Sequence, residues 1–472
     1  MKNKGKLIRE IGFWTAIAVV ISNMIGTGIF TITGFMAADV PDPIWIIGLW
    51  VLGGFIALMG ALTVAELGAM LPFAGGDYIY IHNGYGPFWA YLTGWMSFFV
   101  GFSAPIAASA IAFMEYISFF TPSLSPLQFY NIDIGIISLK VSWGHFFAVL
   151  VIFLFAGFHY AGLKASKLVQ NSITSLKILF ILIVIGASFL WGNGNWQHFN
   201  KNFIDNPTSI SLTKAGVSLI FVMFAYSGWN AASYIAGEIK NPGKNIPRSL
   251  IIGTLVVMLL YLLLNMVYFY ALPINEMKGV LRIGSESMNA LFGSSVSSFT
   301  TVIFAVSILA CLSAMVFIGP RVYYAMAEDN LFFKKFKEVH PVFKTPSKAI
   351  LLQAGWSSVL LISGTFDQLL TYASFILMGF SAMTVSTVYI LRKKLPNAER
   401  PYKTFGYPIS PVIFIIMSIW MMTYTVIERP FESLFGILTI LAGIPFYIIF
   451  TKRNIKHIML FYLKKLLTPF VR

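Results

Sequence analysis

The chain has 472 residues, of which 57% are hydrophobic and only 11% charged, and its mean hydropathy is +0.78. Charged residues make up roughly a quarter of soluble domains, so this composition excludes a water-soluble core. In a soluble protein, a net charge of +15 would suggest binding to nucleic acid. Here we expect the basic residues to set membrane orientation and meet anionic headgroups. Membrane lipid is therefore an expected partner, and nucleic acid is not.

Apolar runs of about 20 residues, long enough to cross a hydrocarbon core of about 30 Å, recur along the chain. The first run follows four basic residues and so mimics a secretory signal. It is too long for one and lacks a cleavage site, so we expect a retained helix. The runs predict an all-α integral membrane protein with spans near 12–36, 43–70, 86–118, 142–159, 167–191, 213–237, 249–271, 297–320, 349–363, 367–391, 408–427 and 432–451.

The distribution of basic residues indicates orientation, because Lys and Arg accumulate in cytoplasmic loops. With the N-terminus inside, 26 of the 33 basic residues fall in cytoplasmic segments, six in outer segments and one, Lys177, within a span. This split predicts a multi-pass protein with both termini in the cytoplasm. The sequence has no Asn-x-Ser/Thr sequon with x other than proline, which fits a bacterial inner membrane.

Cysteine and histidine usage gives no sign of catalysis. The single cysteine, Cys311, lies within a span, so neither an internal disulfide nor a metal cluster of cysteine ligands can form. The six histidines are scattered, nearly all in loops or at span ends. A membrane-embedded enzyme needs clustered acids, bases or nucleophiles at membrane depth, and none appears. We therefore expect no catalytic residue, no metal site and no cofactor.

Two spans interrupt their own helices in mid-membrane. Residues 24–30 read Met-Ile-Gly-Thr-Gly-Ile-Phe, and residues 224–230 read Phe-Ala-Tyr-Ser-Gly-Trp-Asn. Each glycine weakens a helix by about 1 kcal/mol relative to alanine. The breaks lie five spans apart, and because five is odd the two helices cross in opposite senses. Paired breaks of this kind are typical of transporters built from inverted five-helix repeats.

Unwound backbone at that depth is tolerated only where it faces protein or a water-filled cavity. The N–H groups at a half-helix N-terminus attract an anion, and the carbonyls at a half-helix C-terminus attract a cation. A site with both ends suits a zwitterion. The alternative is that the glycines only allow close helix packing. A phosphate-binding loop fits less well, because the third glycine and the preceding strand are missing.

At these breaks the sequence resembles the amino acid-polyamine-organocation (APC) superfamily, and in particular its L-type amino acid transporter branch. The resemblance continues through residues 65–78, 238–248, 319–327 and 400–408. It implies a LeuT-like fold in which the first and sixth helices are unwound at mid-membrane. The implied parts are a cytoplasmic tail (1–11), two inverted five-helix repeats (12–191 and 213–391), helices eleven and twelve (408–451) and a basic cytoplasmic tail (452–472).

The resemblance also assigns a substrate site. It implies that the N–H groups of Thr27 and Gly28 hold the carboxylate of an amino acid. The carbonyls of Met24, Phe224 and Ala225 would take its ammonium group, with the carbonyl of Ser227 as a further candidate. The full predicted substrate-binding set is Met24, Ile25, Gly26, Thr27, Gly28, Phe224, Ala225, Tyr226, Ser227, Trp229 and Asn230.

Side chains at the sixth-span break have separate implied roles. Phe224 resembles the aromatic gate that closes over substrate from outside. Asn230 resembles the polar residue that links this span to the substrate or to its neighbours. Tyr226 and Trp229 are either substrate contacts or packing residues. Ser227 stands where the L-type branch usually has glycine. A side chain there should narrow the pocket or add a hydroxyl, which predicts a preference for smaller neutral L-amino acids over large aromatic ones.

Lys177 lies about 15 Å into the fifth span. A lysine near mid-bilayer costs about 2.5–3.5 kcal/mol on insertion scales, which makes it a functional candidate; the alternative is snorkelling to the headgroups. The resemblance places Lys177 where relatives hold a lysine against the unwound first span. Its ammonium would stand in for sodium and donate to a carbonyl near Gly26. A lysine that alternates between charged and neutral forms could couple transport to protons, whereas a permanently charged one would serve a sodium-independent exchanger.

Three carboxylates have local roles in this interpretation. Glu66, near the inner end of the second span, and Glu115, near the outer end of the third, are expected to reach an interface or pair locally rather than relay protons. Glu238, beside Lys240, resembles a member of a cytoplasmic-gate salt bridge.

The sequence thus predicts a secondary active transporter of amino acids that works by exchange or proton coupling. Alternatives are an amino acid sensor or channel-like protein of the same fold, a permease for polyamines or cationic amino acids, and a carrier built from six-helix halves. Animal L-type relatives pair with a single-span glycoprotein through an outer-loop cysteine. This chain has no cysteine there, so no disulfide-linked partner subunit is predicted, and the oligomeric state is left open.

Overall fold

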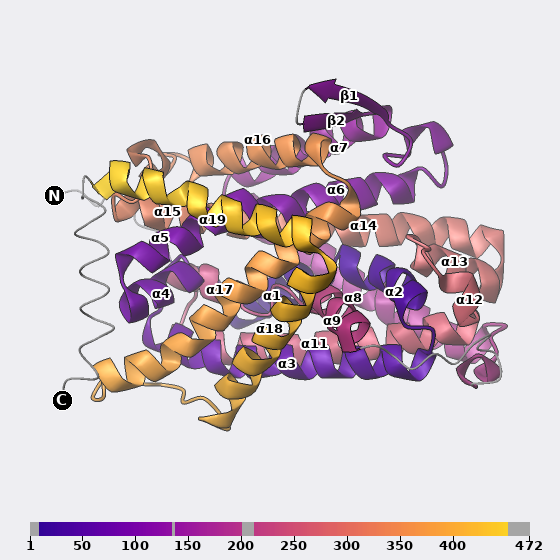
Figure 1. Ribbon diagram of the computed structural model, residues 1–472, viewed down its shortest axis with the longest axis horizontal. Helices are drawn as coiled ribbons and strands as arrows, with labels where there is room; N and C mark the ends of the chain where they lie inside the picture. The colour runs from indigo at the N-terminus through magenta and orange to yellow at the C-terminus, as the bar shows by residue number, and fades with distance from the viewer. Residues whose placement is uncertain (1–8, 135–136, 201–211, 452–472) are drawn as a thin grey trace.

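The computed structural model describes residues 9–134, 137–200 and 212–451, which form a bundle of long helices (Figure 1). In this part of the chain, ten helical stretches are long and apolar enough to cross a membrane. The sixth span is a broken helix whose first half, Leu212–Ala225, is shorter, and the ninth is the 17-residue helix Ser347–Ser363. Together these give the twelve predicted spans and confirm the all-α membrane fold.

The first five spans are built from eight helical segments. They are α1 (Phe13–Met24) and α2 (Thr27–Asp39) in the first span, α3 (Pro43–Met70) in the second, α5 (Pro87–Met96), η1 (Ser97–Phe102) and α6 (Ser103–Ile117) in the third, α7 (Trp143–Tyr160) in the fourth and α8 (Leu163–Trp191) in the fifth.

The later spans are also built from helical segments. They are α9 (Leu212–Ala225) and α10 (Ala231–Tyr234) in the sixth, α11 (Pro242–Ala271) in the seventh, α14 (Ser294–Ile318) and α15 (Pro320–Glu328) in the eighth, α16 (Ser347–Ser363) in the ninth, α17 (Phe366–Lys394) in the tenth, α18 (Ile409–Glu428) in the eleventh and α19 (Pro430–Thr451) in the twelfth. Of the predicted tails, residues 1–8 and 452–472 lie outside the described part.

Short elements connect the spans. They are α4 (Asp77–Tyr85), η2 (Pro122–Leu124), β1 (Tyr130–Ile134), β2 (Ile137–Val141), η3 (Trp196–Phe199), η5 (Ala236–Glu238), α12 (Ile274–Met277), α13 (Ile283–Phe292) and η6 (Lys334–Lys337). β1 and β2 pair antiparallel, with Tyr130 opposite Val141, and the hairpin contacts α7 and α16. The sequence analysis did not predict this hairpin.

Local signals explain several helix starts. α3, α5, α11, α15 and α19 each begin with proline at the first helical position, where the missing N–H has no intrahelical acceptor to lose. The Asp42 side chain accepts from Ile44 N (2.8 Å) and caps α3. At the start of α17, Thr365 and Gln368 form a capping box.

The end of the eighth span differs from the prediction. We placed the boundary at residue 320 and counted Arg321 among cytoplasmic loop residues, but α14 and α15 continue the apolar helical stretch to Glu328. Arg321 is 1% exposed and pairs with the Glu238 carboxylate. A buried arginine is tolerated when it is paired, so its charge does not mark a span end.

The two broken spans lie at the centre of the bundle. α11 packs along α3, and α9 contacts α2 and α3. On the other side, α14 packs along α6 and α8. α1 contacts both groups, through α11 on one side and through α8 and α14 on the other (Figure 1). Protein therefore surrounds the freed backbone groups, as their depth in the membrane requires.

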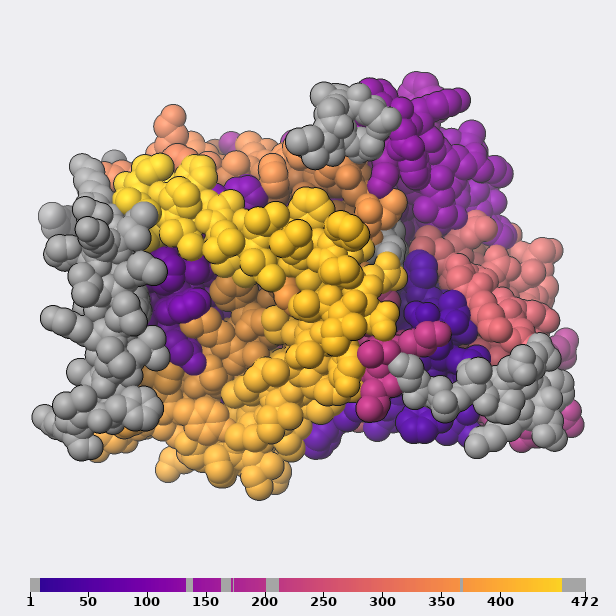
Figure 2. All heavy atoms as spheres, in the orientation of Figure 1, coloured from indigo at the N-terminus to yellow at the C-terminus, as the bar shows by residue number. Residues whose placement is uncertain are grey.

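α18 and α19 cover one face of the bundle, where Figure 2 shows them in orange to yellow. The outer side of α19 exposes a helical stripe of large apolar side chains, namely Phe431, Leu434, Phe435, Leu438 and Leu441. Such a stripe would be costly in water and suits contact with acyl chains.

Candidate substrate site

The first span breaks where its glycine motif predicts. After α1 ends, Ile25 is extended and Gly26 has φ −143° and ψ −144°, and α2 begins at Thr27. A Cβ atom on Gly26 would overlap Cys311 Sγ on α14, so the close approach requires glycine. The first N–H groups of α2, including that of Gly28, have no intrahelical acceptor and carry the partial positive charge of a helix N-terminus.

The sixth span breaks over a longer stretch. α9 includes Phe224 and Ala225, the first two residues of the motif at 224–230. The chain turns through residues 226–230 before α10 begins. Ser227 N donates to Phe224 O (2.9 Å), and Gly228 has φ +95°. A Cβ atom on Gly228 would overlap Asn23 Nδ2 at the other break. The two breaks therefore touch, and glycine is needed at this contact for both its conformation and its size.

Side chains of neighbouring spans hold the carbonyls of the first break. Lys177 on α8 is 2% exposed, and its ammonium donates to Ile25 O (2.5 Å) and Ser22 O (3.4 Å). Cys311 Sγ donates to Asn23 O (3.3 Å). The contact expected between Lys177 and a carbonyl near the first glycine is thus present, and its role in coupling stays a prediction. Cys311 is more than a packing residue, because it too holds the unwound backbone.

Tyr261 on α11 joins the two breaks. Its hydroxyl lies 2.5 Å from Met24 O and 2.9 Å from Ala225 O, and because it has one hydrogen it donates to one of them at a time. Both carbonyls were predicted to take the substrate ammonium, and in this structure they already have a protein donor. Tyr261 was not among the predicted site residues, because a tyrosine inside an apolar run usually serves packing.

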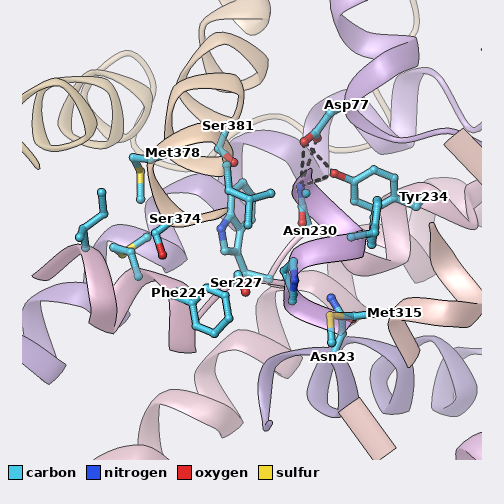
Figure 3. Close-up of a pocket in the computed structure, with 18 of the residues that line it drawn as sticks. Asn23, Asp77, Phe224, Ser227, Asn230, Tyr234, Met315, Ser374, Met378 and Ser381 are labelled. Carbon is cyan, nitrogen blue, oxygen red and sulfur yellow. Dashed lines mark hydrogen bonds between the residues drawn. The ribbon is translucent and has the colours of Figure 1, made fainter. Parts of the chain in front are cut away.

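A cavity of about 60 Å³ lies beside the breaks (Figure 3). Among the predicted residues, Phe224, Ser227, Trp229 and Asn230 line it. Tyr226 instead donates its hydroxyl to the backbone carbonyl of Trp50 on α3 (3.1 Å) and packs there. The predicted residues that do not line the cavity are Met24, Ile25, Gly26, Thr27, Gly28, Ala225 and Tyr226.

One wall of the cavity comes from the tenth span, which the sequence analysis did not assign to the site. Ser374, Leu377, Met378 and Ser381 line the cavity from α17. Their spacing of three and four residues places them on one helix face, a signal that was visible in the sequence. The third span contributes Gly101 from η1, a π-helical segment, and such segments often occur at functional sites.

A buried carboxylate forms the end of the cavity. Asp77, the first residue of α4, is 5% exposed and lines the cavity. It accepts from Tyr234 Oη (2.8 Å) and from Asn230 Nδ2 (3.1 and 3.2 Å), as Figure 3 shows. α4 lies between the second and third spans. Burial raises the pKa of Asp77 to about 6, although both hydrogen bonds act to lower it.

The end of the molecule that carries α4 and α15 is closed. Arg321 Nε lies 3.0 Å from Glu238 Oε1, and both side chains are buried. Ile11 N donates to Glu238 O (2.8 Å), and Lys240 N donates to Ile11 O (2.8 Å). The segment before α1 is therefore fastened to the end of the sixth span. Glu238 is in an ion pair as expected, with Arg321 as its partner.

The opposite end is closed by the segment between α12 and α13. Gly279 N donates to Gly34 O on α2 (2.9 Å). Arg282 Nε lies 4.0 Å from Glu115 Oε1, and Ser125 Oγ donates to Glu115 Oε2 (2.7 Å). Glu115 thus pairs locally, as expected. These contacts fasten segments together at both ends of the bundle.

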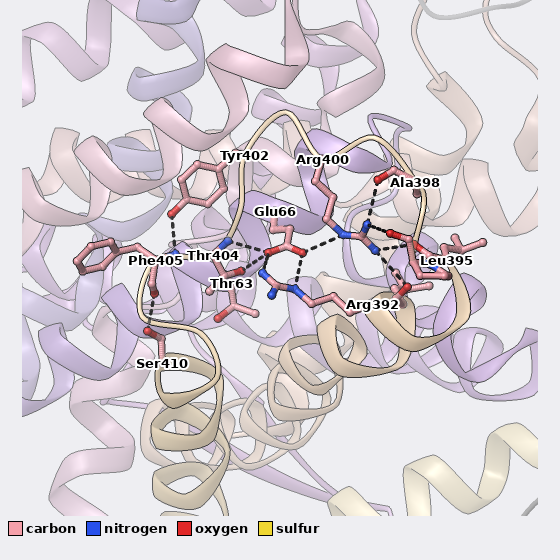
Figure 4. A network of polar contacts seen from close by, with 12 residues as sticks. Thr63, Glu66, Arg392, Leu395, Ala398, Arg400, Tyr402, Thr404, Phe405 and Ser410 are labelled. Atoms are coloured by element: carbon pink, nitrogen blue, oxygen red, sulfur yellow. Dashed lines mark hydrogen bonds and ion pairs between the residues drawn. The ribbon is translucent and has the colours of Figure 1, made fainter.

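Glu66 also pairs locally, at the end of α3 (Figure 4). Its carboxylate accepts from Arg392 Nη2 (2.6 Å) and from Thr404 N (2.7 Å), and it lies 3.3 Å from Arg400 Nε. These contacts fasten the connection between α17 and α18 to the second span. They lie apart from the residues that line the cavity.

A helical bundle with two broken spans beside a central cavity has the architecture of a membrane carrier. The chain belongs to the amino acid permease family of the APC superfamily, whose model, Amino acid permease, matches residues 11–449. The family and its relatives are transporters and not enzymes, so the chain is an amino acid transporter.

Curated relatives match over almost the whole chain. The serine/threonine exchanger SteT of Bacillus subtilis is 32% identical over 95% of this chain and 98% of its own length. The b(0,+)-type amino acid transporter 1 of Mus musculus is 28% identical over 94% and 88%. The human cystine/glutamate transporter is 26% identical over 95% and 86%. The resemblance to L-type transporters is thereby confirmed.

Proposed function

We propose that this transporter is a sodium-independent exchanger of small neutral L-amino acids. The observation that carries the proposal is the cavity of about 60 Å³ beside the two breaks, into which Ser227, Ser374 and Ser381 project (Figure 3). The hydroxyls suit a substrate with a small polar side chain, because a site that hydrogen-bonds a substrate hydroxyl discriminates against analogues that lack it. The similarity to a serine/threonine exchanger supports the same substrate class.

A free acceptor in the cavity supports amino acid binding. Asn23 lines the cavity, and its Oδ1 is buried without a hydrogen-bond partner among the described residues. A buried acceptor left unpaired is costly, and a substrate ammonium group would satisfy it. The N–H groups of Thr27 and Gly28 remain the proposed partners of the carboxylate. Phe224, which is buried and lines the cavity, remains the proposed gate.

Sodium independence is proposed from the contacts of Lys177. Its ammonium occupies the place beside Ile25 O where a bound cation would otherwise neutralise the carbonyls. A covalently attached cation removes the need for a soluble one. Proton coupling through Lys177 is the competing form of the proposal.

In the proposed orientation, both termini, α4, α15 and η6 lie on the cytoplasmic side of a bacterial inner membrane, because the basic residues gather at that end. The two inverted repeats at 12–191 and 213–391 are the proposed moving units.

The test is uptake of labelled serine into proteoliposomes, with and without internal serine. We expect internal serine to accelerate uptake, choline to replace sodium without loss, and alanine, serine and threonine to compete. Stronger competition by leucine or phenylalanine would contradict the size preference. Uptake driven by a pH gradient without internal substrate would replace exchange with proton coupling, and absence of saturable counterflow would favour a channel or a sensor.

Asp77 favours a second candidate, a permease for cationic amino acids. Its carboxylate lines the cavity and could pair with a basic side chain if Tyr234 and Asn230 released it. This candidate would be supported if arginine or lysine competed for uptake more strongly than serine does, and if that competition were lost in Asp77→Asn.

A further inference from the structure

A second groove lies away from the substrate cavity, near η6 and the end of α19. It has a volume of about 530 Å³, within the roughly 300–1,000 Å³ typical of small-molecule sites. Its walls are mostly apolar and come from four parts of the chain. They include Trp95 and Phe99 of the third span, Phe333 before η6, Leu352 of α16 and Phe446 of α19.

The aromatic walls are held together by ring contacts. The ring of Trp95 lies 4.2 Å from that of Phe99 and 5.0 Å from that of Phe446. Phe333 contacts Phe450 of α19, with 5.1 Å between ring centroids. The groove is therefore preformed. Phe333 and Phe446 nevertheless remain 54% and 41% exposed, which leaves aromatic surface open to a ligand.

The edge of the groove is cationic. Lys334 and Lys335 of η6 are exposed and line it, and neither has a hydrogen bond or ion pair with another described residue. The nearby Lys348, by contrast, is paired with Glu338 (2.5 Å). Two unpaired ammonium groups beside an aromatic groove favour an amphipathic ligand with an anionic head.

The location of the groove identifies the ligand class. Phe446 belongs to α19, whose outer face is the apolar stripe described above, so the groove adjoins the hydrocarbon. η6 follows the end of the eighth span, where a headgroup layer is expected. Basic clusters beside a span attract anionic lipid heads, and a soluble anion would make no use of the aromatic walls.

We infer that this groove binds an anionic phospholipid, with an acyl chain along the aromatic walls and the phosphate at Lys334 and Lys335. In the proposed orientation the lipid belongs to the cytoplasmic leaflet. The site requires only that the chain spans a membrane, so it does not depend on which amino acid is carried.

The experiment uses the full chain in proteoliposomes that contain phosphatidylglycerol with a photoreactive diazirine on one acyl chain. Mass spectrometry after illumination should find cross-links in the segment 332–336 and in the second half of α19. A phosphatidylcholine probe with the same chains should label these segments less. Equal labelling by the two probes, or labelling only elsewhere, would overturn the proposal.

A charge variant and a matched control locate the headgroup. Lys334→Gln/Lys335→Gln should reduce groove labelling by about fivefold for each lysine, the value of one basic residue near a charged bilayer. Lys393→Gln/Lys403→Gln removes the same charge from exposed residues that do not line the groove, and should leave labelling unchanged. Equal loss in the two double variants would reduce the effect to general surface charge and refute a site.

Two further arms separate the alternatives. Leu352→Trp fills part of the apolar wall and should reduce labelling while the size-exclusion profile of the protein stays the same; undiminished labelling in a folded variant would contradict an acyl chain there. Excess soluble sn-glycerol 3-phosphate should not compete with the probe. Competition by that anion would assign the lysines to a soluble phosphate instead of a lipid.

Discussion

The two broken spans differ in how the protein uses them. At the first break only Ile25 and Gly26 leave the helical conformation, and the carbonyls there are held by donors from other spans. At the second, residues 226–230 unwind, and Ser227, Trp229 and Asn230 present their side chains to the cavity. The first break is therefore mainly a fixed backbone element, and the second forms part of the cavity wall.

Similar glycine motifs can therefore have different mechanical roles. Lys177 on α8 and Tyr261 on α11 donate hydrogen bonds to the carbonyls of the first break, so the geometry of this break depends on how these spans pack. The second break is joined to α4 through Asn230 and Asp77, so it can respond to a proton or to a substrate. The following variants separate the two roles.

The largest effect is expected at the first break, from Lys177→Met. The change keeps much of the side-chain volume and removes the charged donor to Ile25 O. A lost hydrogen bond from a charged group costs about 1.5–3 kcal/mol, so we expect serine uptake to fall by up to about 100-fold. Lys140→Met, outside the spans, should leave uptake nearly unchanged. Unchanged uptake and unchanged pH dependence in Lys177→Met would refute a coupling role.

Tyr261→Phe should have the next largest effect, because it removes the hydroxyl that joins the two breaks. A buried hydrogen bond lost in this way costs about 1–2 kcal/mol, and we expect uptake to fall by about tenfold. Tyr268→Phe on the same helix is the control, since the Tyr268 hydroxyl is buried and has no hydrogen-bond partner among the described residues. Equal losses in the two variants would show that the contact with the breaks is unimportant.

Asp77→Asn should change the pH dependence at the second break. The raised pKa of about 6 means that the folded protein binds a proton more readily than the unfolded chain, whose value is 3.8. The contribution of Asp77 to the free energy of unfolding should therefore fall as the pH rises from about 4 to about 6, and it should be constant at higher pH. Melting temperatures in detergent between pH 4 and pH 7 check this.

The Asn variant should lose that slope, and Glu399→Gln, which changes an exposed carboxylate, should keep it. Tyr80 and Tyr234 lie near Asp77, and the ordinary pKa of a tyrosine hydroxyl, about 10, is far above this range. An unaltered slope in Asp77→Asn would assign the pH dependence to another group.

The smallest effect is expected from Ser227→Gly, which changes the cavity wall without touching the first break. Removing the side chain enlarges the cavity and deletes a hydroxyl. One small group in a pocket is worth about 1–3 kcal/mol of discrimination, so leucine should gain at least severalfold against serine in competition assays. Ser218→Gly, a buried α9 position that does not line the cavity, is the control. An unchanged ranking would show that Ser227 does not set selectivity.

Much of the fold was predictable from the sequence. Apolar runs gave twelve spans, and glycines in mid-membrane marked both breaks, because lipid leaves a backbone no partners and so makes any interruption visible. The charge pattern gave a wrong end for the eighth span, because Arg321 is buried in α15 and is paired with Glu238, a residue far away in the chain. The hairpin of β1 and β2 carried no comparable signal.

The site was predicted less completely. Of the predicted residues, Phe224, Ser227, Trp229 and Asn230 line the cavity and the others do not, and the wall from α17 was not predicted. Serines at helical spacing are common in membrane spans, and only the packing of α17 beside the second break gives Ser374 and Ser381 a meaning.

Local composition and backbone chemistry are enough to show that this chain spans a membrane and where its helices break. Tertiary structure alone decided which groups satisfy the freed carbonyls, that Asp77 meets Asn230, and how small the cavity is. These features depend on contacts between segments that lie far apart in the chain, and such contacts leave no periodic pattern in either segment.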